Sequence, residues 1–461
     1  MTLNRAESGE VSVRVQVYRD GELLENAQGA SDINEFVVGI ELYESISSAT
    51  LEAKLVIQDN AGLINQFTGS ELFKISITGS VYDNTYFMRA YNIESRSKIN
   101  QTSDVFIMNL TSDEYIRNEV SNVFGNSEVI FKETSAKKII ETIIKSNLYL
   151  NSKKRVYVEQ SLNKHQFVIP NWRPFDCIYW LCSRSIRNNS PGKNLQGGYV
   201  FFENRIGYHF KSVDQMIDDV NNQSADTETN PNGTESSAKV RLYKYEYTPK
   251  NTSENKILEQ FKIESITFPE EKNFLMGLRH GTWSGFSIGL DPVTVSSSKM
   301  GVSTDLAADA YRYSIKESWG KMSHLKGGKN KNPIEKMDKG IQDMIDYPKR
   351  VRYTILPNQI FDPKYSTNPQ KNYEQLVELQ AYQWMRIESI KNVKLQIVVP
   401  GNLDLYAGYG IEVIIPSTAR SGKTTKIDKR YSGRYLIAGV SHKIVNNNMA
   451  TELLLLKDSI Q

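Results

Sequence analysis

The two ends of the chain carry the same succession of alternating residues and turns. Near the N-terminus, hydrophobic and polar residues alternate over 51–57, a turn follows at 58–62, and a second alternating stretch runs over 69–77. Near the C-terminus the same succession occupies 393–399, 400–402 and 408–415. Alternation with a period of two predicts strands that bury one face. The chain therefore carries one β module twice, and three copies of such a chain would place six modules in a ring.

Each module is expected to finish with a hairpin. Residues 86–94 return through 104–110 in the first module, and 435–442 return through 451–456 in the second. The closing residues, 109–113 and 456–459, are also alike. Two similar β modules at opposite ends leave the middle of the chain for a different kind of domain.

Length and composition limit the class of protein. A chain of 461 residues suggests roughly three domains. A formal net charge of +3 gives no support for a dedicated nucleic-acid binder, which would show a clustered basic face. No apolar run approaches a membrane span, so membrane insertion is not expected. The polar first residues lack a signal peptide's apolar stretch, which predicts synthesis and folding in a cytoplasm. Cys177 and Cys182 are expected to be buried thiols.

The predicted order of domains follows from changes in periodicity. Residues 1–114 are almost entirely β, beginning with Val11, Val13, Val15 and Val17 in one alternating strand. Residues 115–240 mix helices, at 136–144 and from Pro174, with strands at 156–158, 198–202 and 205–210. We place a tight turn at 203–204 and a polar loop at 221–238.

The remaining segments are expected to complete the second module around an insertion. We predict strands at 241–247, 257–266 and 276–283 within a segment of 241–295, and short helical pieces at 307–319 and 334–344 within an extension of 296–375 that packs on the middle domain. A helix over 373–390 leads into the last segment, 376–461. The predicted fold class is α+β and β-dominated, with two β barrels and an inserted α+β domain.

No catalytic, cofactor-binding or metal-binding residues are predicted. The histidines are isolated from one another and from metal-ligand spacing, and we interpret them as exposed or hydrogen-bonded strand residues; they are His165, His209, His280, His324 and His442. Gly422-Lys423-Thr424 lacks the leading glycine of a phosphate-binding loop, because Ser417 stands there. A flexible, charged hairpin tip over 417–431 is the better interpretation. Glu270-Glu271 lack a paired carboxylate, and no serine is expected in a nucleophile elbow between a strand and a helix. The chain is therefore not expected to be an enzyme.

Three stretches together resemble a known family. They are 49–59 followed by 69–75, then 169–181 with its Pro-Asn-Trp-Arg-Pro-Phe entry into a helix, and 432–444 (SGRYLIAGVSHKI) with the turn at 446–448. In this order they resemble the baseplate hub proteins of contractile-tailed bacteriophages, which are related to the hub part of type VI secretion spike proteins. Segments 297–375 and 221–238 have no counterpart in this resemblance.

The resemblance implies two barrels like those of tail-tube proteins, the second interrupted so that 241–291 joins 377–457. It implies a homotrimer whose six barrels form a pseudo-sixfold ring. The partners would be the tail tube protein or a tube-initiator ring, the central spike protein and, on the outside, baseplate wedge proteins. DNA would pass through the lumen without specific binding. The protein would belong to the virion tail baseplate, act in genome ejection, and be assembled in the host cytoplasm.

Two other functions compete with a structural adaptor. A tail-associated cell-wall hydrolase would need paired carboxylates or a zinc site, which the spacing does not provide. A carbohydrate-binding tail protein would use exposed aromatic residues, of which the 25 Tyr supply many candidates.

Overall fold

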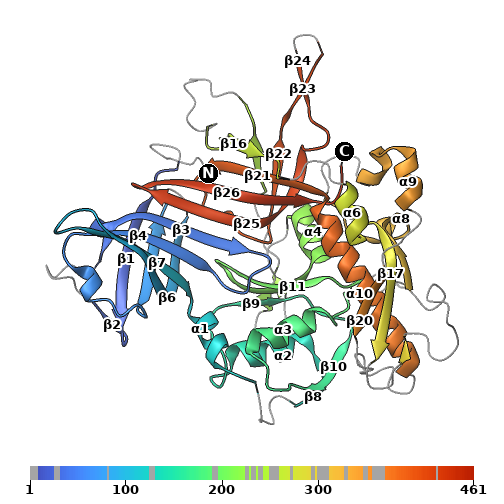
Figure 1. Cartoon of the computed structure of the whole chain (residues 1–461), viewed down its shortest axis with the longest axis horizontal. Helices are drawn as coiled ribbons and strands as arrows, with labels where there is room; N and C mark the ends of the chain where they lie inside the picture. The colour runs from blue at the N-terminus through green and yellow to red at the C-terminus, as the bar shows by residue number, and fades with distance from the viewer. Residues whose placement is uncertain are drawn as a thin grey trace.

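The chain folds into two β modules joined in one large sheet, with an α+β domain and an insertion beside them (Figure 1). The structure is a computed structural model. It describes residues 9–24, 32–79, 82–123, 130–188, 196–223, 228–229, 235–236, 242–248, 259–269, 274–291, 296–297, 311–325, 331–345, 351–355, 369–421 and 424–460. The fold is β-dominated α+β, as the sequence predicts. No helix among these residues is long and apolar enough to cross a membrane.

The first module contains seven strands, and its alternating stretches are confirmed. They are β1 (Ser12–Arg19), β2 (Glu22–Leu23), β3 (Val37–Ser45), β4 (Glu52–Asp59), β5 (Leu72–Thr78), β6 (Asp83–Lys98) and β7 (Asp104–Ser112). Their order in the sheet is β3-β4-β7-β6-β5-β1-β2. The inward-facing residues, including Leu55, Phe73 and Phe106, are fully buried because each lies on the core side of an alternating strand.

The second module takes strands from two separate parts of the chain. They are β15 (Tyr243–Glu246), β16 (Ser265–Thr267), β21 (Val393–Pro400), β22 (Gly410–Ile414), β25 (Gly433–Val445) and β26 (Asn448–Lys457). Their order is β16-β21-β26-β25-β22-β15, which repeats β3-β4-β7-β6-β5-β1 strand for strand. The last pair differs, because β15 runs parallel to β22 whereas β1 runs antiparallel to β5. A hairpin of β23 (Pro416–Ser421) and β24 (Thr424–Ile427) projects from this module.

The α+β domain packs its helices against a short sheet. Its elements are α1 (Asp113–Val120), β8 (Ile130–Ser135), α2 (Ala136–Lys145), β9 (Val156–Val158), β10 (Lys164–Val168), α3 (Pro174–Cys182), β11 (Tyr199–Asn204), β12 (Gly207–Ser212) and α4 (Val213–Asn222). Helices α2 and α3 are confirmed, and both cysteines are buried and unpaired. Helix α4 was not predicted and includes the start of the expected loop at 221–238. The rest of that loop lies outside the described residues, apart from β13 (Glu228–Thr229) and β14 (Glu235–Ser236).

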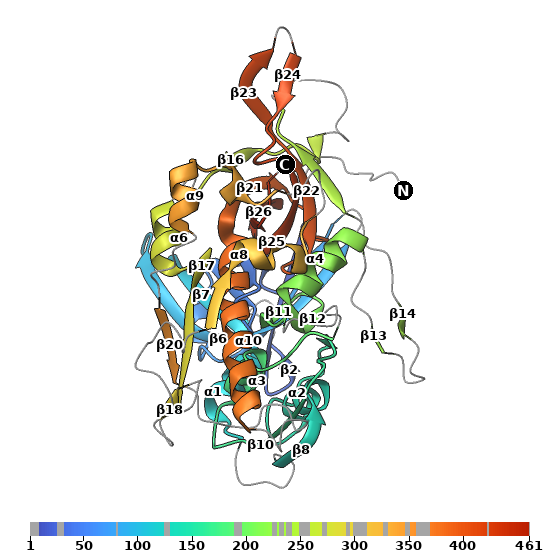
Figure 2. The ribbon, with the colours of Figure 1, turned by 90° about the vertical axis from the view of Figure 1, so that its right-hand side faces the viewer.

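The insertion forms a small sheet covered by a long helix. Its strands are β17 (Ser284–Asp291), β18 (Ser296–Ser297), β19 (Tyr311–Ser314) and β20 (Val351–Ile355), and its helices are α6 (Phe274–His280), α8 (Ile315–Ser318), α9 (Lys339–Ile345) and α10 (Pro369–Ser389). Figure 2 shows α10 running along this sheet. Short 3-10 turns lie at Asn34–Phe36, Leu63–Asn65, Trp319–Lys321, Pro333–Lys336 and Ile390–Asn392.

Several local predictions were wrong. The strand expected at 276–283 is helix α6 through residue 280, because Gly277 lets the helix pack against Trp283; an added Cβ would lie 2.5 Å from that ring. Where a strand was expected at 257–266, the strand in the described structure is β16, Ser265–Thr267. Strand β17 belongs to the insertion's sheet and not to the second module. Residues 311–314, expected to be helical, form β19, and the turn expected at 203–204 falls at 205–206.

A buried ion cluster holds the insertion, the α+β domain and the end of the second module together. The guanidinium of Arg386 in α10 is fully buried; its Nε lies 3.0 Å from Asp214 Oδ1 and its Nη1 lies 2.8 Å from Asp458 Oδ2. Asp214 also accepts a hydrogen bond from Tyr382 Oη at 2.9 Å. Asp458 follows β26, and its other partner is His324, 2.9 Å away. One cation therefore joins three parts of the chain that are distant in sequence.

Replacing this cation is expected to be costly. Arg386→Met leaves two carboxylates buried without their counterion, which should lower the free energy of unfolding by roughly 3–5 kcal/mol. The matched control is Lys391→Met, which removes the half-exposed pair with Glu388 and should cost less than about 1 kcal/mol. Urea denaturation followed by circular dichroism measures both. Equal losses in the two variants would contradict the assignment of Arg386 as a structural centre.

Candidate functional site

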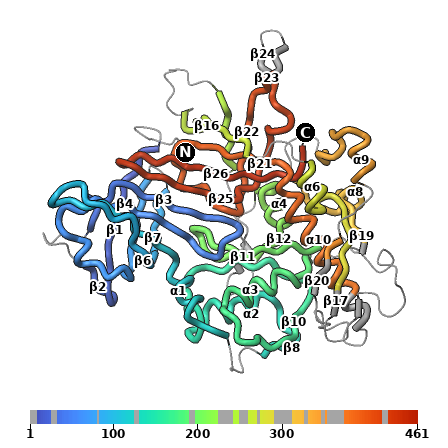
Figure 3. The backbone as a smooth tube through the Cα atoms, in the orientation of Figure 1, coloured from blue at the N-terminus to red at the C-terminus, as the bar shows by residue number. Residues whose placement is uncertain are grey.

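Strand β25 is shared between the two modules. Its first half pairs with β22, from Val413 opposite Gly433 to Gly410 opposite Leu436. Its second half pairs with β3 of the first module, from Gly439 opposite Ser45 to Val445 opposite Gly39. The sheet therefore continues from one module into the other, as the adjacent blue and red traces in Figure 3 show. We call this pairing the internal junction.

A β-bulge marks the point where β25 changes partners. Opposite β26, Ile437 faces Leu455 and Gly439 faces Leu454, so Ala438 is the extra residue. A bulge bends its strand and increases the local twist. The bend turns the rest of β25 away from β22 and toward β3. The backbone N–H of Ile46, just after β3, then donates to the Ala438 carbonyl at 3.0 Å.

Strand β6 of the first module carries the same bulge at the corresponding place. Opposite β7, Ala90 faces Leu110 and Asn92 faces Asn109, so Tyr91 is the extra residue. Pairing with β5 ends at Arg89, two residues before the bulge. In β25 the pairing with β22 ends at Leu436, also two residues before the bulge. The first module is therefore shaped for a junction of the same kind.

Two of the open sheet edges in the described chain match the two strands of the internal junction. After its bulge, β6 pairs with β7 alone, and no described strand lies on its other side. Strand β16 pairs with β21 alone, so it ends the sheet. In the repeated strand order β16 corresponds to β3, the strand that β25 uses at the internal junction. Unpaired edges present rows of N–H and C=O groups that can accept another strand.

A buried polar cluster lies behind the internal junction. Glu44 of β3 is 4% exposed, and its carboxylate accepts hydrogen bonds from the backbone N–H of Arg205 at 2.9 Å and of Ala407 at 3.2 Å. The Arg205 guanidinium donates to Asn84 at 2.9 Å and to Asp404 at 2.8 Å. The cluster ties the turn between β11 and β12 to both modules, and so fixes the α+β domain against the junction.

Burial controls the ionisation of Glu44. Loss of solvation raises the pKa of its carboxyl to about 7. The hydrogen bond from the Ala407 N–H, and the charge and backbone N–H of Arg205, lower this pKa but do not outweigh the loss of solvation. Between about pH 4.5 and pH 7, the folded protein therefore favours the protonated form of Glu44, whereas an exposed glutamate is ionised.

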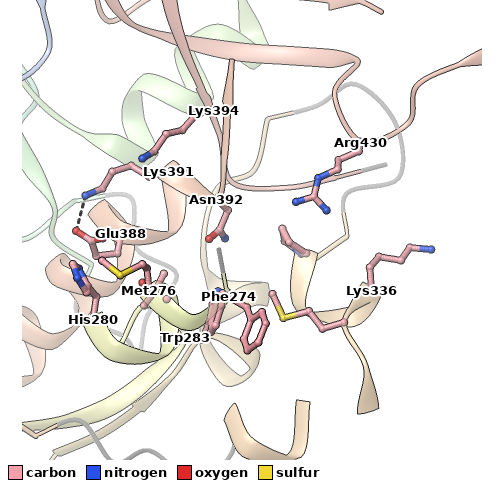
Figure 4. Close-up of a pocket in the computed structure, with 14 residues that line it drawn as sticks. Phe274, Met276, His280, Trp283, Lys336, Glu388, Lys391, Asn392, Lys394 and Arg430 are labelled. Carbon is pink, nitrogen blue, oxygen red and sulfur yellow. Dashed lines mark hydrogen bonds and ion pairs between the residues drawn. The ribbon is translucent and has the colours of Figure 1, made fainter. Parts of the chain in front are cut away.

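A hollow of about 690 Å³ lies beside α6 and the start of β21 (Figure 4). Apolar side chains of α6 line one part of it, and the basic residues Lys336, Lys391, Lys394 and Arg430 line the rest. Its one carboxylate, Glu388, is bound to Lys391 at 2.6 Å. This lining offers no nucleophile with an adjacent base and no pair of carboxylates. It is better suited to apolar contact and to negative charge than to acid–base chemistry.

The residues examined in the sequence do not come together in one site. His165 and His442 are buried, and burial lowers the pKa of each imidazole to about 4. His209 is stacked between two rings and bonds Asn204, and His280 lines the hollow beside α6. Gly422, Lys423, Glu270 and Glu271 lie outside the described residues. Among those described, no group of three His, Cys, Asp or Glu could hold a metal ion.

Sequence reasoning missed the residues that matter most here. Glu44 and Arg205 are separated by 161 positions, and neither belongs to a motif. Tyr91 and Ala438 carry no sequence signal of a bulge. The one available signal was the repeat itself. Aligning the closing strands of the two modules would have matched Tyr91 with Ala438.

Two solved tail-protein structures are similar in fold to this chain. No family model and no curated protein sequence matches the chain. A tail protein from Neisseria meningitidis aligns over 97% of both chains, with a TM-score of 0.52 and 9% identity. The 43 kDa tail protein of prophage MuSo2 from Shewanella oneidensis aligns over 98% of this chain and 100% of its own, with a TM-score of 0.51 and 10% identity. The chain thus has the fold of these phage-type tail proteins over nearly its whole length.

The stability that Glu44 contributes depends on pH. Its folded-state pKa of about 7 lies above its unfolded value of 4.5. The contribution is therefore fully present below about pH 4.5 and is lost as the pH rises through about 7. The loss by pH 8 is up to about 3 kcal/mol. Glu44→Gln removes this titration, so its melting temperature should fall less between pH 5 and pH 8 than that of the wild type. Differential scanning fluorimetry measures the two slopes.

A control variant separates this effect from general loss of charge. Glu141→Gln, at an exposed position on α2, should keep the wild-type slope. A wild-type slope in Glu44→Gln would contradict the predicted ionisation of Glu44.

Proposed function

We propose that the chain is a structural hub protein of a phage tail baseplate, and that it acts as a homotrimer joining the sixfold tail tube to the threefold central spike. The observation that carries the proposal is the internal junction, which joins two modules of the same strand order edge to edge in one sheet. The similarity of fold to tail proteins supports the setting.

Symmetry favours a trimer. A sixfold partner requires six similar surfaces, whereas a threefold partner requires three distinct ones. A trimer of a chain with two similar modules supplies both. The differences between the modules, such as the β23–β24 hairpin on the second alone, recur three times around such a ring and would form the threefold surface.

We propose that DNA passes through the ring along the outer face of the joined sheet. That face carries both signs of charge, from Glu41, Glu52 and Glu452 and from Lys54 and Lys443. A strongly positive lumen would hold the phosphate backbone by releasing its counterions, and a mixed lumen lets DNA slide. No specific DNA binding is expected.

The remaining partners follow from the same proposal. One side of the ring would contact the tail tube protein or a tube-initiator ring, and the other side the spike. The insertion would face baseplate wedge proteins, and the protein would reside in the virion tail after assembly in the host cytoplasm. The role is structural and not catalytic, which is consistent with a hollow beside α6 that lacks an acid–base pair.

Light scattering coupled to size exclusion tests the trimer. We expect a particle of about 158 kDa, three times the chain mass of 52.5 kDa, with a share that grows with protein concentration. A particle that remains at 52.5 kDa at the highest concentration, or a stable dimer, would overturn the proposal.

A further inference from the structure

We propose that neighbouring chains join by repeating the internal junction, with the open edge of β6 in one chain pairing with β16 of the next. This inference rests on the proposed trimer, and it adds the contact surface and the register. Four observations carry it: the repeated strand order, the repeated bulge, the two open edges, and the side chains that flank those edges.

The register follows from the correspondence of the two modules. Matching the closing strands β7 and β26 places Ser97 at the position of Lys443, counted across a second extra residue between Glu94 and Ser97 that β25 lacks. Matching β4 with β21 places Thr267 at the position of Glu41. Because Lys443 lies opposite Glu41 at the internal junction, Ser97 of one chain should lie opposite Thr267 of the next.

Side chains must supply much of the binding energy between chains. Strand β16 has three residues whereas β3 has nine, so the edge offers few backbone hydrogen bonds. Exposed apolar side chains among the described residues after β16 can supply the missing binding energy. They are Phe268, Phe274, Leu275 and Met276, each between 41 and 48% exposed. Clusters of this kind on a surface mark contact sites.

The opposite edge carries a matching aromatic surface. Tyr91, the bulged residue of β6, is 54% exposed. Phe87, four residues earlier, and Tyr115, which acts electrostatically on the Tyr91 phenol, are also exposed. At the internal junction Ile46, which follows β3, donates its backbone N–H to the carbonyl of the corresponding Ala438 and packs against the apolar cluster that includes Ala438. We expect the exposed apolar residues described after β16, Phe268 and those of α6, to cover Tyr91 of the neighbouring chain.

Charge at the two edges is complementary. Glu52 and Ser441 line the same hollow at the internal junction. Matching the two modules places Lys394 of β21 at the position of Glu52, and Glu94 of β6 at the position of Ser441. Between chains, Lys394 and Glu94 would therefore line a hollow of the same kind. The surroundings of Tyr91 are acidic, since Glu52 and Glu94 add to burial in raising the pKa of its phenol. The surroundings of α6 are basic. A second copy of this chain is therefore the occupant that fits both edges.

A disulfide tests the register. Each chain carrying both Ser97→Cys and Thr267→Cys should link to its two neighbours under mild oxidation and run as a covalent trimer in non-reducing electrophoresis. Ser97→Cys with Ser265→Cys is the matched control, because a shift of two residues moves the partner by about 6.6 Å. The native thiols are buried and should not interfere.

The outcomes separate this contact from the proposed function. A trimer by light scattering that does not crosslink, or that links equally through Ser265, would overturn the contact and leave the trimeric hub intact. A monomer under all conditions would overturn both.

Charge reversal tests the facing surfaces independently. Glu94→Lys and Lys394→Glu should each raise the concentration at half assembly by about fivefold, and the double variant should return it to near the wild-type value. Glu141→Lys, on an exposed face of α2, is the control and should have no effect. Additive losses in the double variant would show that these two residues do not face one another.

Discussion

The backbone pairing of β25 with β3 is the interaction on which the rest of the structure depends. It joins two modules of the same strand order into one sheet, and the bulge at Ala438 gives the angle at which they meet. No described strand pairs with the outer side of β16 or with β6 beyond its bulge on the side away from β7, and these two edges match the strands of the junction. Exposed edges are an aggregation risk for a free monomer, and a ring in which they pair removes that risk while gaining interface energy.

Buried ion clusters hold the other domains at fixed positions around this sheet. Glu44 and Arg205 connect the α+β domain to the internal junction, whereas Arg386 connects the insertion to the end of β26. Each cluster joins parts of the chain that are distant in sequence, so loosening one would change the relative position of whole domains. The proposed role between a tube and a spike would require such rigidity.

The sequence predicted most strands of both modules and the helices α2, α3 and α10, because hydrophobic periodicity is a local signal that each of these elements carries on its own. It did not predict β3, and it predicted a strand far longer than β16. The sequence predicted a strand where helix α6 lies. Gly277 of this helix packs closely against Trp283, and such a tertiary contact leaves no local pattern in the sequence. The internal junction and the ion clusters could not be predicted from one sequence, since strand edges and buried charges find partners by tertiary packing. The repeat suggested a ring, but it did not identify the edges.

The most direct measurement of the central claim is electron microscopy of the purified assembly viewed along its axis. Class averages should show a closed ring of six similar lobes around a central opening, with three sets of peripheral density from the α+β domain and the insertion. Averages with twofold symmetry, an open chain of lobes, or isolated two-lobed particles at concentrations where light scattering reports the assembly would contradict the account.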